Sequence, residues 1–306
     1  MPLQKTKFIW MDGEWKDWDN AKVHVLTHAL HYGTGVFEGI RCYDTVKGPA
    51  IFRLKEHISR LYNSAKILRM EPKWTVMEFM EACKEGVRKN GLKACYLRPV
   101  IYRGYGEMGV NPFGSPVSAF IAIWPWAAYL GDDGLKNGIK VITSSFTRHF
   151  VNSVMTKAKI TGAYINAVLA KMEAHEQGFV EAIMLDINGE VCEGTGENIF
   201  VVKDGEIKTV PLSSSILGGV TRDTVIRLAR DLGYTLKEET ITRDELYIAD
   251  EVFFTGTAAE VTPVVEIDRR KIADGKVGQV TKNIQSKFFD IVNAGDSRYD
   301  KWLTHV

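Results

Sequence analysis

The sequence predicts an α+β (mixed α/β) fold in two domains. A chain of 306 residues can form one large or two medium domains with a substantial core. Short strands recur in hairpin-like pairs interleaved with helices, unlike the regular alternation of a parallel α/β fold. A segment rich in glycine and aspartate, residues 125–138, separates the two parts of the chain.

The first part of the chain combines one hairpin, two helices and two further strands. The dipeptide Asp12-Gly13 is typical of a tight hairpin turn. Apolar residues at helical spacing mark both helices, and Thr75 and Asn90 are the expected cap and end of the second one. In chain order, the expected elements are the hairpin 8–15, the helices 54–68 and 75–91, and the strands 95–102 and 118–124.

The second part of the chain begins with a strand and includes two further helices. These helices stop at Gly178 and Gly233, because glycine is favoured just beyond a helix end. The last expected strand leads into a tight turn. In chain order, the expected elements are the strand 139–146, the helix 162–178, the strands 181–186 and 190–193, the hairpin 198–210, the helix 221–233 and the strand 249–264.

Composition and charge exclude several classes of protein. The 39 basic and 38 acidic residues nearly cancel, so the chain lacks the charge typical of proteins that bind nucleic acid or an anionic membrane. The N-terminus lacks the apolar core of a signal peptide, and the longest apolar run, 119–130, is too short to span a bilayer. The four cysteines form no CxxC pair, so we expect reduced thiols in a cytoplasmic protein.

Several common catalytic motifs are absent from the sequence. It has no P-loop, no HExxH and no GxSxG, and the glycine-rich stretches 33–39 and 194–199 miss the spacing of a dinucleotide-binding loop. His24, His28 and His31 have a spacing that could hold a metal on a helix. However, no carboxylate is nearby and His24 falls in an expected strand, Val23–Leu26. We therefore expect hydrogen-bonded histidines near a turn, and no metal site.

Two lysines, Lys157 and Lys159, stand just before the helix 162–178. Either they are ordinary surface charges, or one of them takes part in chemistry. A reactive lysine needs a neutral amine, an electrophile and an electron sink, and pyridoxal phosphate supplies the last two. This cofactor requires a carboxylate at its ring nitrogen, amides, hydroxyls and an arginine at its phosphate, and a donor at its phenolic oxygen.

Each requirement has a candidate in the sequence. Two glycines precede a helix that starts at Thr221, and the amides of a helix N-terminus bind anions. A turn at 255–257 offers further amides and hydroxyls. Arg60 could reach a phosphate, Glu193 could face the ring, and Tyr164 follows Lys159 closely. Each feature alone is typical of a capped helix, a turn or a surface charge, so only the combination points to the cofactor.

Together and in this order, these segments resemble the branched-chain aminotransferases of fold type IV among the pyridoxal-phosphate enzymes. The resemblance implies a two-domain fold like that of D-amino-acid aminotransferase, with the cofactor at the domain interface. It also implies ping-pong amino transfer, through pyridoxamine phosphate, between leucine, isoleucine or valine and 2-oxoglutarate or glutamate. The implied division is a small N-terminal α/β domain 1–125, a loop 126–138 and a large cofactor-binding domain 139–306. The matching segments are 23–43, 96–112, 157–164, 189–200, 217–226 and 250–264.

The resemblance also assigns cofactor roles to individual residues. Lys159 matches the lysine that binds the cofactor and moves the proton, and Lys157 has no assigned role. Glu193 matches the partner of the ring nitrogen, Tyr164 matches the donor to the phenolic oxygen, and Leu217 packs on the ring. The residues implied at the phosphate are Arg60, Gly219, Val220, Thr221, Gly256 and Thr257.

Substrate residues are implied in the same way. Tyr96 and Arg98 are two apart on a strand and so share a face. In the family, the tyrosine and the backbone at Thr257 and Ala258 bind the α-carboxylate, and the arginine pairs with glutamate's distal carboxylate. The residues implied as aromatic walls are Tyr32, Phe37, Trp126 and Tyr129. The residues implied to reach a neighbouring subunit's site are Met108 and Val110.

Alternatives remain open at this point. Other enzymes of the same fold include D-amino-acid and amine transaminases and aminodeoxychorismate lyase. A class I aldolase with a reactive lysine and a binding protein without catalysis are further rivals. Ala163 departs from the family, where an asparagine is more usual. The resemblance implies at least a homodimer, and similar bacterial enzymes are often hexamers.

Overall fold

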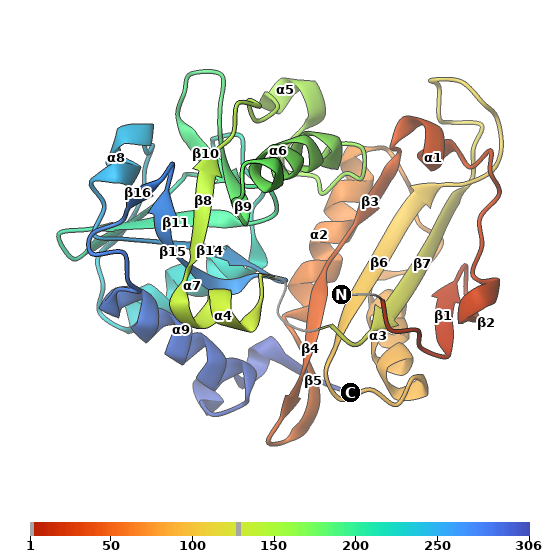
Figure 1. Cartoon of the computed structure of the whole chain (residues 1–306). Coiled ribbons are helices and arrows are strands. Elements are labelled where there is room, and N and C mark those ends of the chain that lie inside the picture. Colours follow the sequence, from red (N-terminus) through yellow and green to blue (C-terminus); the bar gives the residue numbers. More distant parts are fainter. Residues whose placement is uncertain (1–2, 127–129) are drawn as a thin grey trace. The chain divides into compact units, whose positions relative to one another are not determined.

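The computed structural model describes residues 3–126 and 130–306, which form two compact units. The chain passes between the units several times (Figure 1). The short segment that carries Lys159 belongs to unit 1, although the residues on both sides of it belong to unit 2. Unit 1 comprises Met1–Trp126, Ala158–Ala163 and Ile291–Val306, and unit 2 comprises Ala127–Lys157 and Tyr164–Asp290. The domain boundaries expected from the sequence stay a prediction.

Unit 1 contains an antiparallel sheet whose described strands follow the order β17-β5-β4-β6-β7-β1-β2, with β3 paired to β6. The hairpin expected at Asp12-Gly13 is confirmed, since both residues have positive φ angles and join β1 to β2. The strands are β1 (Phe8–Met11), β2 (Glu14–Asp17), β3 (Gly35–Phe37), β4 (Ile40–Thr45), β5 (Gly48–Phe52), β6 (Cys95–Arg103), β7 (Val117–Trp124) and β17 (Leu303–His305).

The helices of unit 1 include the two that the periodicity predicts. They are α2 (Leu54–Ile67) and α3 (Val76–Lys89), which pack against each other and against strands of the sheet. Thr75 is the N-cap of α3, and its hydroxyl accepts a hydrogen bond from the Glu78 amide while the Glu78 carboxylate accepts one from the Thr75 amide. The shorter helices are α1 (His28–Tyr32), η1 (Trp18–Asn20) and η2 (Ser297–Trp302).

The strand expected over Val23–Leu26 is wrong. These residues form irregular structure and a turn, and α1 begins at His28. Local side-chain contacts satisfy the backbone there: the Leu26 amide donates to the His24 ring, and the His31 ring bonds to the Val25 carbonyl oxygen. The apolar alternation in this segment therefore does not mark a strand.

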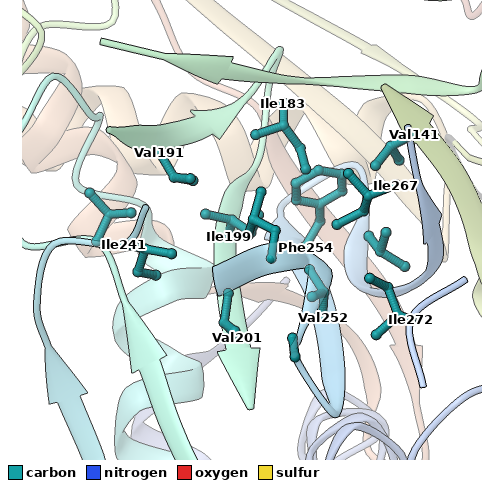
Figure 2. Close-up of a cluster of buried hydrophobic side chains, with 14 of the residues drawn as sticks. Val141, Ile183, Val191, Ile199, Val201, Ile241, Val252, Phe254, Ile267 and Ile272 are labelled. Atoms are coloured by element: carbon teal, nitrogen blue, oxygen red, sulfur yellow. The ribbon is translucent and has the colours of Figure 1, made fainter. Parts of the chain in front are cut away.

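Unit 2 contains a mixed sheet whose described strands follow the order β10-β9-β8-β15-β14-β11-β12-β13, with β16 paired to β15. Apolar side chains from its strands form a buried cluster around Phe254 (Figure 2). The strands are β8 (Ile139–Thr143), β9 (Glu181–Leu185), β10 (Val191–Gly194), β11 (Asn198–Lys203), β12 (Glu206–Thr209), β13 (Leu236–Glu238), β14 (Glu251–Gly256), β15 (Glu260–Ile267) and β16 (Arg270–Lys271). The segment 249–264 thus forms most of two paired strands instead of the single expected one.

Helices pack on this sheet: α6 contacts β9, α7 contacts β14, and α4 contacts β15. The helix expected from residue 162 begins at Tyr164, two residues later. The helices are α4 (Asp132–Asn137), α5 (Val151–Val154), α6 (Tyr164–Glu176), α7 (Val220–Asp231), α8 (Arg243–Tyr247) and α9 (Gln279–Val292), whose last two residues belong to unit 1. Among residues 3–126 and 130–306, no helix is long and apolar enough to cross a membrane.

Candidate active site

In unit 1, α2 presents Arg60 to a buried carboxylate. Arg60 donates from Nε and Nη2 to Glu38, at 2.5 and 2.8 Å, and Glu38 is fully buried. His57, one turn earlier on α2, approaches the same carboxylate with Nδ1 at 2.7 Å. Neither Glu38 nor His57 was predicted as a site residue, because the carboxylate lies far along the chain from both of its partners.

The charges in this cluster are balanced. Burial alone raises the pKa of Glu38, but the charge of Arg60 and the contact with His57 outweigh burial and hold this pKa well below its usual range. Burial lowers the pKa of His57 more than Glu38 raises it, so a neutral ring donates its Nδ1 proton. The result is a carboxylate that fixes the orientation of the Arg60 guanidinium group.

The backbone of Lys159 is fixed on both sides within unit 1. Its amide donates to Ser64 Oγ at 3.0 Å, and its carbonyl accepts from the Phe37 amide at 3.0 Å. Ser64 is buried on α2 and donates to the Arg60 carbonyl oxygen at 2.8 Å. The Lys159 ammonium nitrogen lies 4.7 Å from the centre of the Phe37 ring. Helix α2 therefore positions both Arg60 and the lysine segment.

Four of the predicted substrate residues gather in unit 1. The Arg98 guanidinium group lies 4.8 Å from the centre of the Phe37 ring and donates to the Tyr96 hydroxyl at 3.3 Å. The Tyr96 ring meets Trp126 edge-on, 4.4 Å between centres. Tyr96 and Arg98 thus share a face, as predicted. Arg98 Nε is buried and has no hydrogen-bond partner among the described residues.

Three other residues that were predicted at the substrate are exposed. Tyr32 lies on α1 beside the His28 ring, and Tyr32, Met108 and Val110 are exposed in unit 1. Tyr129 lies outside the described residues. The substrate roles of these four residues stay predictions, as do those of the residues in the cluster above and of Thr257 and Ala258.

In unit 2, three donors hold the carboxylate of Glu193 on β10. Arg148 Nη2 lies 2.7 Å from Oε1, and Oε2 accepts from Asn198 Nδ2 and from the Leu217 amide, each at 3.1 Å. Glu193 is buried, and the Arg148 guanidinium group supplies a counter-charge beside its carboxylate. Arg148 and Asn198 were not predicted; the ion pair joins residues 45 positions apart, a separation that local sequence patterns do not reveal.

The first turn of α7 lies beside this carboxylate's partners. The N-cap is Gly219, which has no side chain with which to cap the helix. A Cβ atom at this position would overlap Asn198 Oδ1. Thr221 is buried in the first turn. The backbone at Gly219 therefore lies against the Asn198 side chain, at the position where the sequence predicts a phosphate-binding helix start.

The second predicted phosphate segment follows β14 in unit 2. Gly256, the last residue of this strand, and Thr257 and Ala258, in the turn after it, are half-buried. Thr255 Oγ1 is buried and has no hydrogen-bond partner among the described residues. The turn thus offers hydroxyl and amide groups of the kind that bind an anion. Val220 and Tyr164 each stand at the first position of a helix, α7 and α6.

Two further acidic residues, Glu181 and Glu197, are buried in unit 2. Glu181 accepts from Lys171 Nζ at 2.6 Å and from Thr195 Oγ1 at 2.7 Å. Glu197 accepts from the Gly196 amide at 3.0 Å. Burial and the neighbouring charge of Glu181 raise the pKa of Glu197 to about 8, although Lys171 opposes this rise. Burial therefore favours the protonated form of Glu197.

The histidines that could have held a metal are hydrogen-bonded near a turn, as predicted. His28 Nδ1 lies 2.8 Å from Thr34 Oγ1, and its Nε2 lies 2.8 Å from the Gly109 carbonyl oxygen. His24 packs against Tyr105, 4.1 Å between ring centres. These contacts give His24 and His28 a structural role in unit 1.

The chain is similar to curated and solved aminotransferases over almost its whole length. The family model described as Amino-transferase class IV matches residues 35–267. The branched-chain-amino-acid aminotransferase of Pseudomonas aeruginosa is 52% identical over 298 residues, 97% of each chain, and that of Escherichia coli (strain K12) is 48% identical over 303 residues, 99% of this chain and 97% of the relative.

Solved structures agree with the sequence comparison. The crystal structure of the Escherichia coli branched-chain amino acid aminotransferase has a TM-score of 0.96 at 48% identity, and covers 98% of this chain and 99% of that one. The T.th. branched-chain amino acid aminotransferase with pyridoxamine 5'-phosphate has a TM-score of 0.95 at 51% identity, with the same coverage. The predicted family and fold class are confirmed. The chain belongs to the class IV aminotransferases, and among them to the branched-chain-amino-acid aminotransferases.

Proposed function

We propose that this chain transfers the amino group reversibly between L-leucine, L-isoleucine or L-valine and 2-oxoglutarate, with pyridoxal phosphate as cofactor, in branched-chain amino acid metabolism. The relatives' names support this reaction. One related structure holds N-(5'-phosphopyridoxyl)-L-glutamate and another holds 4-methylvaleric acid, which has the carbon chain of leucine without the amino group. These two compounds represent the two substrate classes.

One observation in this chain carries the proposal: three donors orient a buried carboxylate, Glu193. When bound, pyridoxal phosphate supplies a carbonyl group for the substrate's amino group and a ring that withdraws electrons from its α-carbon. A fixed carboxylate suits the protonated nitrogen of that ring. The amides of the first turn of α7 and the buried hydroxyl of Thr255 suit a phosphate group. The residues present therefore fit the cofactor.

We assign the acid–base work to Lys159, which would take the proton from the substrate's α-carbon and give it to C4′ of the bound cofactor, and would move a proton in the opposite direction in the second half-reaction. Ser64 and Phe37 hold its backbone and so limit the directions in which the amine can move. With the cofactor bound, Tyr164 would donate to its phenolic oxygen and Leu217 would pack on its ring.

We assign the phosphate to a group of backbone amides and polar side chains. Glu38 holds the guanidinium group of Arg60 through Nε and Nη2, and so fixes the direction in which this group presents its charge. The amides of the first turn of α7 favour an anion because of the helix dipole. The residues in this role are Arg60, Gly219, Val220, Thr221, Gly256 and Thr257.

We assign substrate recognition to the cluster of Phe37, Tyr96, Arg98 and Trp126. The aromatic rings receive the branched side chain, and Arg98 pairs with the distal carboxylate of glutamate or 2-oxoglutarate. Tyr96 and the backbone at Thr257 and Ala258 bind the α-carboxylate. Apolar pockets separate substrates that differ by one methylene by only about 1–3 kcal/mol, so all three branched-chain amino acids are accepted.

We further propose that the chain acts on these small molecules in the cytoplasm as a homodimer or a larger assembly. Tyr32, Met108 and Val110 are exposed in unit 1, which suits residues that reach a neighbouring copy. Size-exclusion chromatography with light scattering tests the assembly; a monomer at working concentration would contradict it.

Replacement of Arg98 tests the substrate assignment. In Arg98→Met, we expect the KM for 2-oxoglutarate to rise at least about tenfold, because a charge-assisted hydrogen bond to the distal carboxylate is lost. The KM for leucine should change much less, because leucine has no distal carboxylate. Steady-state kinetics with each substrate varied in turn measures both constants.

The control is Arg88→Met, an exposed arginine on α3 that pairs with Glu81. We expect this variant to leave both constants unchanged. Equal changes in the two KM values of Arg98→Met would remove Arg98 from its role.

A further inference from the structure

Lys157 has no role in the reaction proposed above, yet it makes specific contacts in unit 2. Its ammonium group donates to the carbonyl oxygen of Ser214 at 3.1 Å and to that of Ile216 at 2.9 Å. Two carbonyls of one loop thus share one cation. A surface lysine with no structural role would not hold two neighbouring carbonyls in this way, because fixing its side chain costs conformational entropy.

The loop that Lys157 binds leads directly to the Glu193 carboxylate. The Ser214 carbonyl also accepts the Ile216 amide at 2.8 Å, which closes a tight bend. The next residue, Leu217, donates its amide to Glu193 Oε2, and its carbonyl accepts from Asn198 Nδ2 at 2.9 Å. Gly219, two residues further on, is the N-cap of α7. The position of this bend therefore decides where the Leu217 amide and the first turn of α7 lie.

The charge of Lys157 suits this task. An ammonium group makes stronger hydrogen bonds to carbonyl oxygens than a neutral donor does. Burial lowers the pKa of Lys157, the Glu193 charge raises it, and the Arg222 charge lowers it. The lysine therefore lies in the electrostatic field of the Glu193 carboxylate as well as in contact with the loop. It is also only two residues before Lys159 in the sequence.

We propose that Lys157 is a positioning residue: it fixes the Ser214–Gly219 loop so that the Leu217 amide stays on Glu193 and the first turn of α7 stays in place for the cofactor. This inference rests on the proposed function for its consequence, but the loop contact itself does not. The hydrogen bonds of the Lys157 ammonium group go to Ser214 and Ile216, and neither of these residues is assigned to the cofactor. It acts on them through the backbone of the loop.

Three variants of the full-length protein test this proposal: Lys157→Met, Lys157→Arg and Lys282→Met. Methionine keeps the length of the side chain and removes its donors, whereas arginine keeps a donor that can serve two carbonyls. Lys282 is an exposed lysine on α9 and controls for the loss of a surface charge. The first measurement is hydrogen exchange of the amides of residues 214–221. The second is the dissociation constant of pyridoxamine phosphate, by equilibrium dialysis.

We expect Lys157→Met to exchange faster over residues 214–221 alone, and to bind pyridoxamine phosphate about tenfold more weakly, as expected for the loss of a charged hydrogen bond. Lys157→Arg should restore both properties to near the wild-type values, and Lys282→Met should change neither. Unchanged exchange and affinity in Lys157→Met would overturn the proposal. Faster exchange throughout the chain, or an arginine variant as impaired as the methionine one, would overturn it as well.

Failure of the proposed function gives a different result. In that case the wild-type protein itself does not bind pyridoxamine phosphate. The exchange comparison needs no cofactor, so it still decides whether Lys157 fixes the loop.

Discussion

Arg60 and Glu38 form a buried ion pair in which each partner depends on the other. The Arg60 side chain is 15% exposed and that of Glu38 is 0% exposed. Removal of one partner of a buried pair leaves an uncompensated charge, which costs much more than the loss of a solvated pair. The pair fixes Arg60 on α2, so its energy bears on both stability and phosphate binding.

Glu38→Gln should lower the free energy of unfolding by about 3 kcal/mol, because Arg60 then lacks its counter-charge. The matched control is Asp19→Asn, which removes the carboxylate of the exposed pair Lys5–Asp19. We expect an effect of less than about 1 kcal/mol for the control. Urea denaturation of both variants measures the difference. Similar effects of the two substitutions would contradict a buried role for Glu38.

Glu197 makes the stability of the fold depend on pH. Its pKa is raised from 4.5 to about 8 in the folded state, chiefly by burial and then by Glu181. Between these two values the folded state binds more protons than the unfolded state, so the free energy of unfolding falls as the pH rises. For one group the slope approaches about 1.4 kcal/mol per pH unit.

Glu197→Gln should remove this contribution, because glutamine does not titrate. The stability of the variant relative to the wild type should therefore increase from pH 5 to pH 8. Urea denaturation at several pH values, with equal cofactor loading, measures the difference. Parallel pH profiles of the two proteins would show that Glu197 is already ionised at neutral pH.

At the scale of elements, the N-terminus of α7 depends on a glycine. A Cβ atom at Gly219 would overlap Asn198 Oδ1, and Asn198 also holds Glu193 and Leu217 through Nδ2. The amide side chain cannot move without the loss of these two contacts. Gly219 therefore couples the start of α7, through Asn198, to the Glu193 carboxylate.

Gly219→Ala should weaken pyridoxamine phosphate binding at least about tenfold, because Asn198 is displaced from a buried carboxylate. The neighbouring Gly218→Ala is a matched control, since its Cβ atom would meet only Leu212 at 3.5 Å, an ordinary contact. Equilibrium dialysis compares the two variants with the wild type. Equal affinities of the two alanine variants would contradict the coupling.

Elements with strong local signals were predictable from the sequence. Helix α3 has amphipathic spacing and a capping box at Thr75, and the hairpin at Asp12-Gly13 has its own turn dipeptide. The strand predicted at Val23–Leu26 was wrong, because local contacts with His24 and His31 satisfy the backbone of this segment. The sequence prediction did not separate β14 from β15. The turn between them contains no proline, and the one nearby glycine, Gly256, is the last residue of β14.

The site was predictable only in part. Motifs and the family resemblance singled out Lys159, Arg60 and Glu193 as candidates, and their roles stay predictions. The partners that orient these groups, Glu38 and Arg148 among them, come from distant parts of the chain. Such pairs depend on tertiary structure, and no local pattern in a single sequence specifies them.

At the scale of the whole molecule, the residues assigned to the reaction come from both units. Lys159 and Arg60 belong to unit 1, and Glu193 and the first turn of α7 belong to unit 2. The chain returns to unit 1 for the short segment Ala158–Ala163 and again from Ile291 onwards, and the first of these returns carries Lys159.

The most direct test of the proposed reaction is the visible absorption spectrum of the purified holoenzyme, before and after L-leucine is added without an oxo acid. The yellow band of the bound cofactor should bleach with leucine and return when 2-oxoglutarate is added. Lys159→Ala should lose this response, because no amine remains to move the proton. A yellow band that leucine does not change, or a Lys159→Ala variant that responds as fast as the wild type, would contradict the central claim.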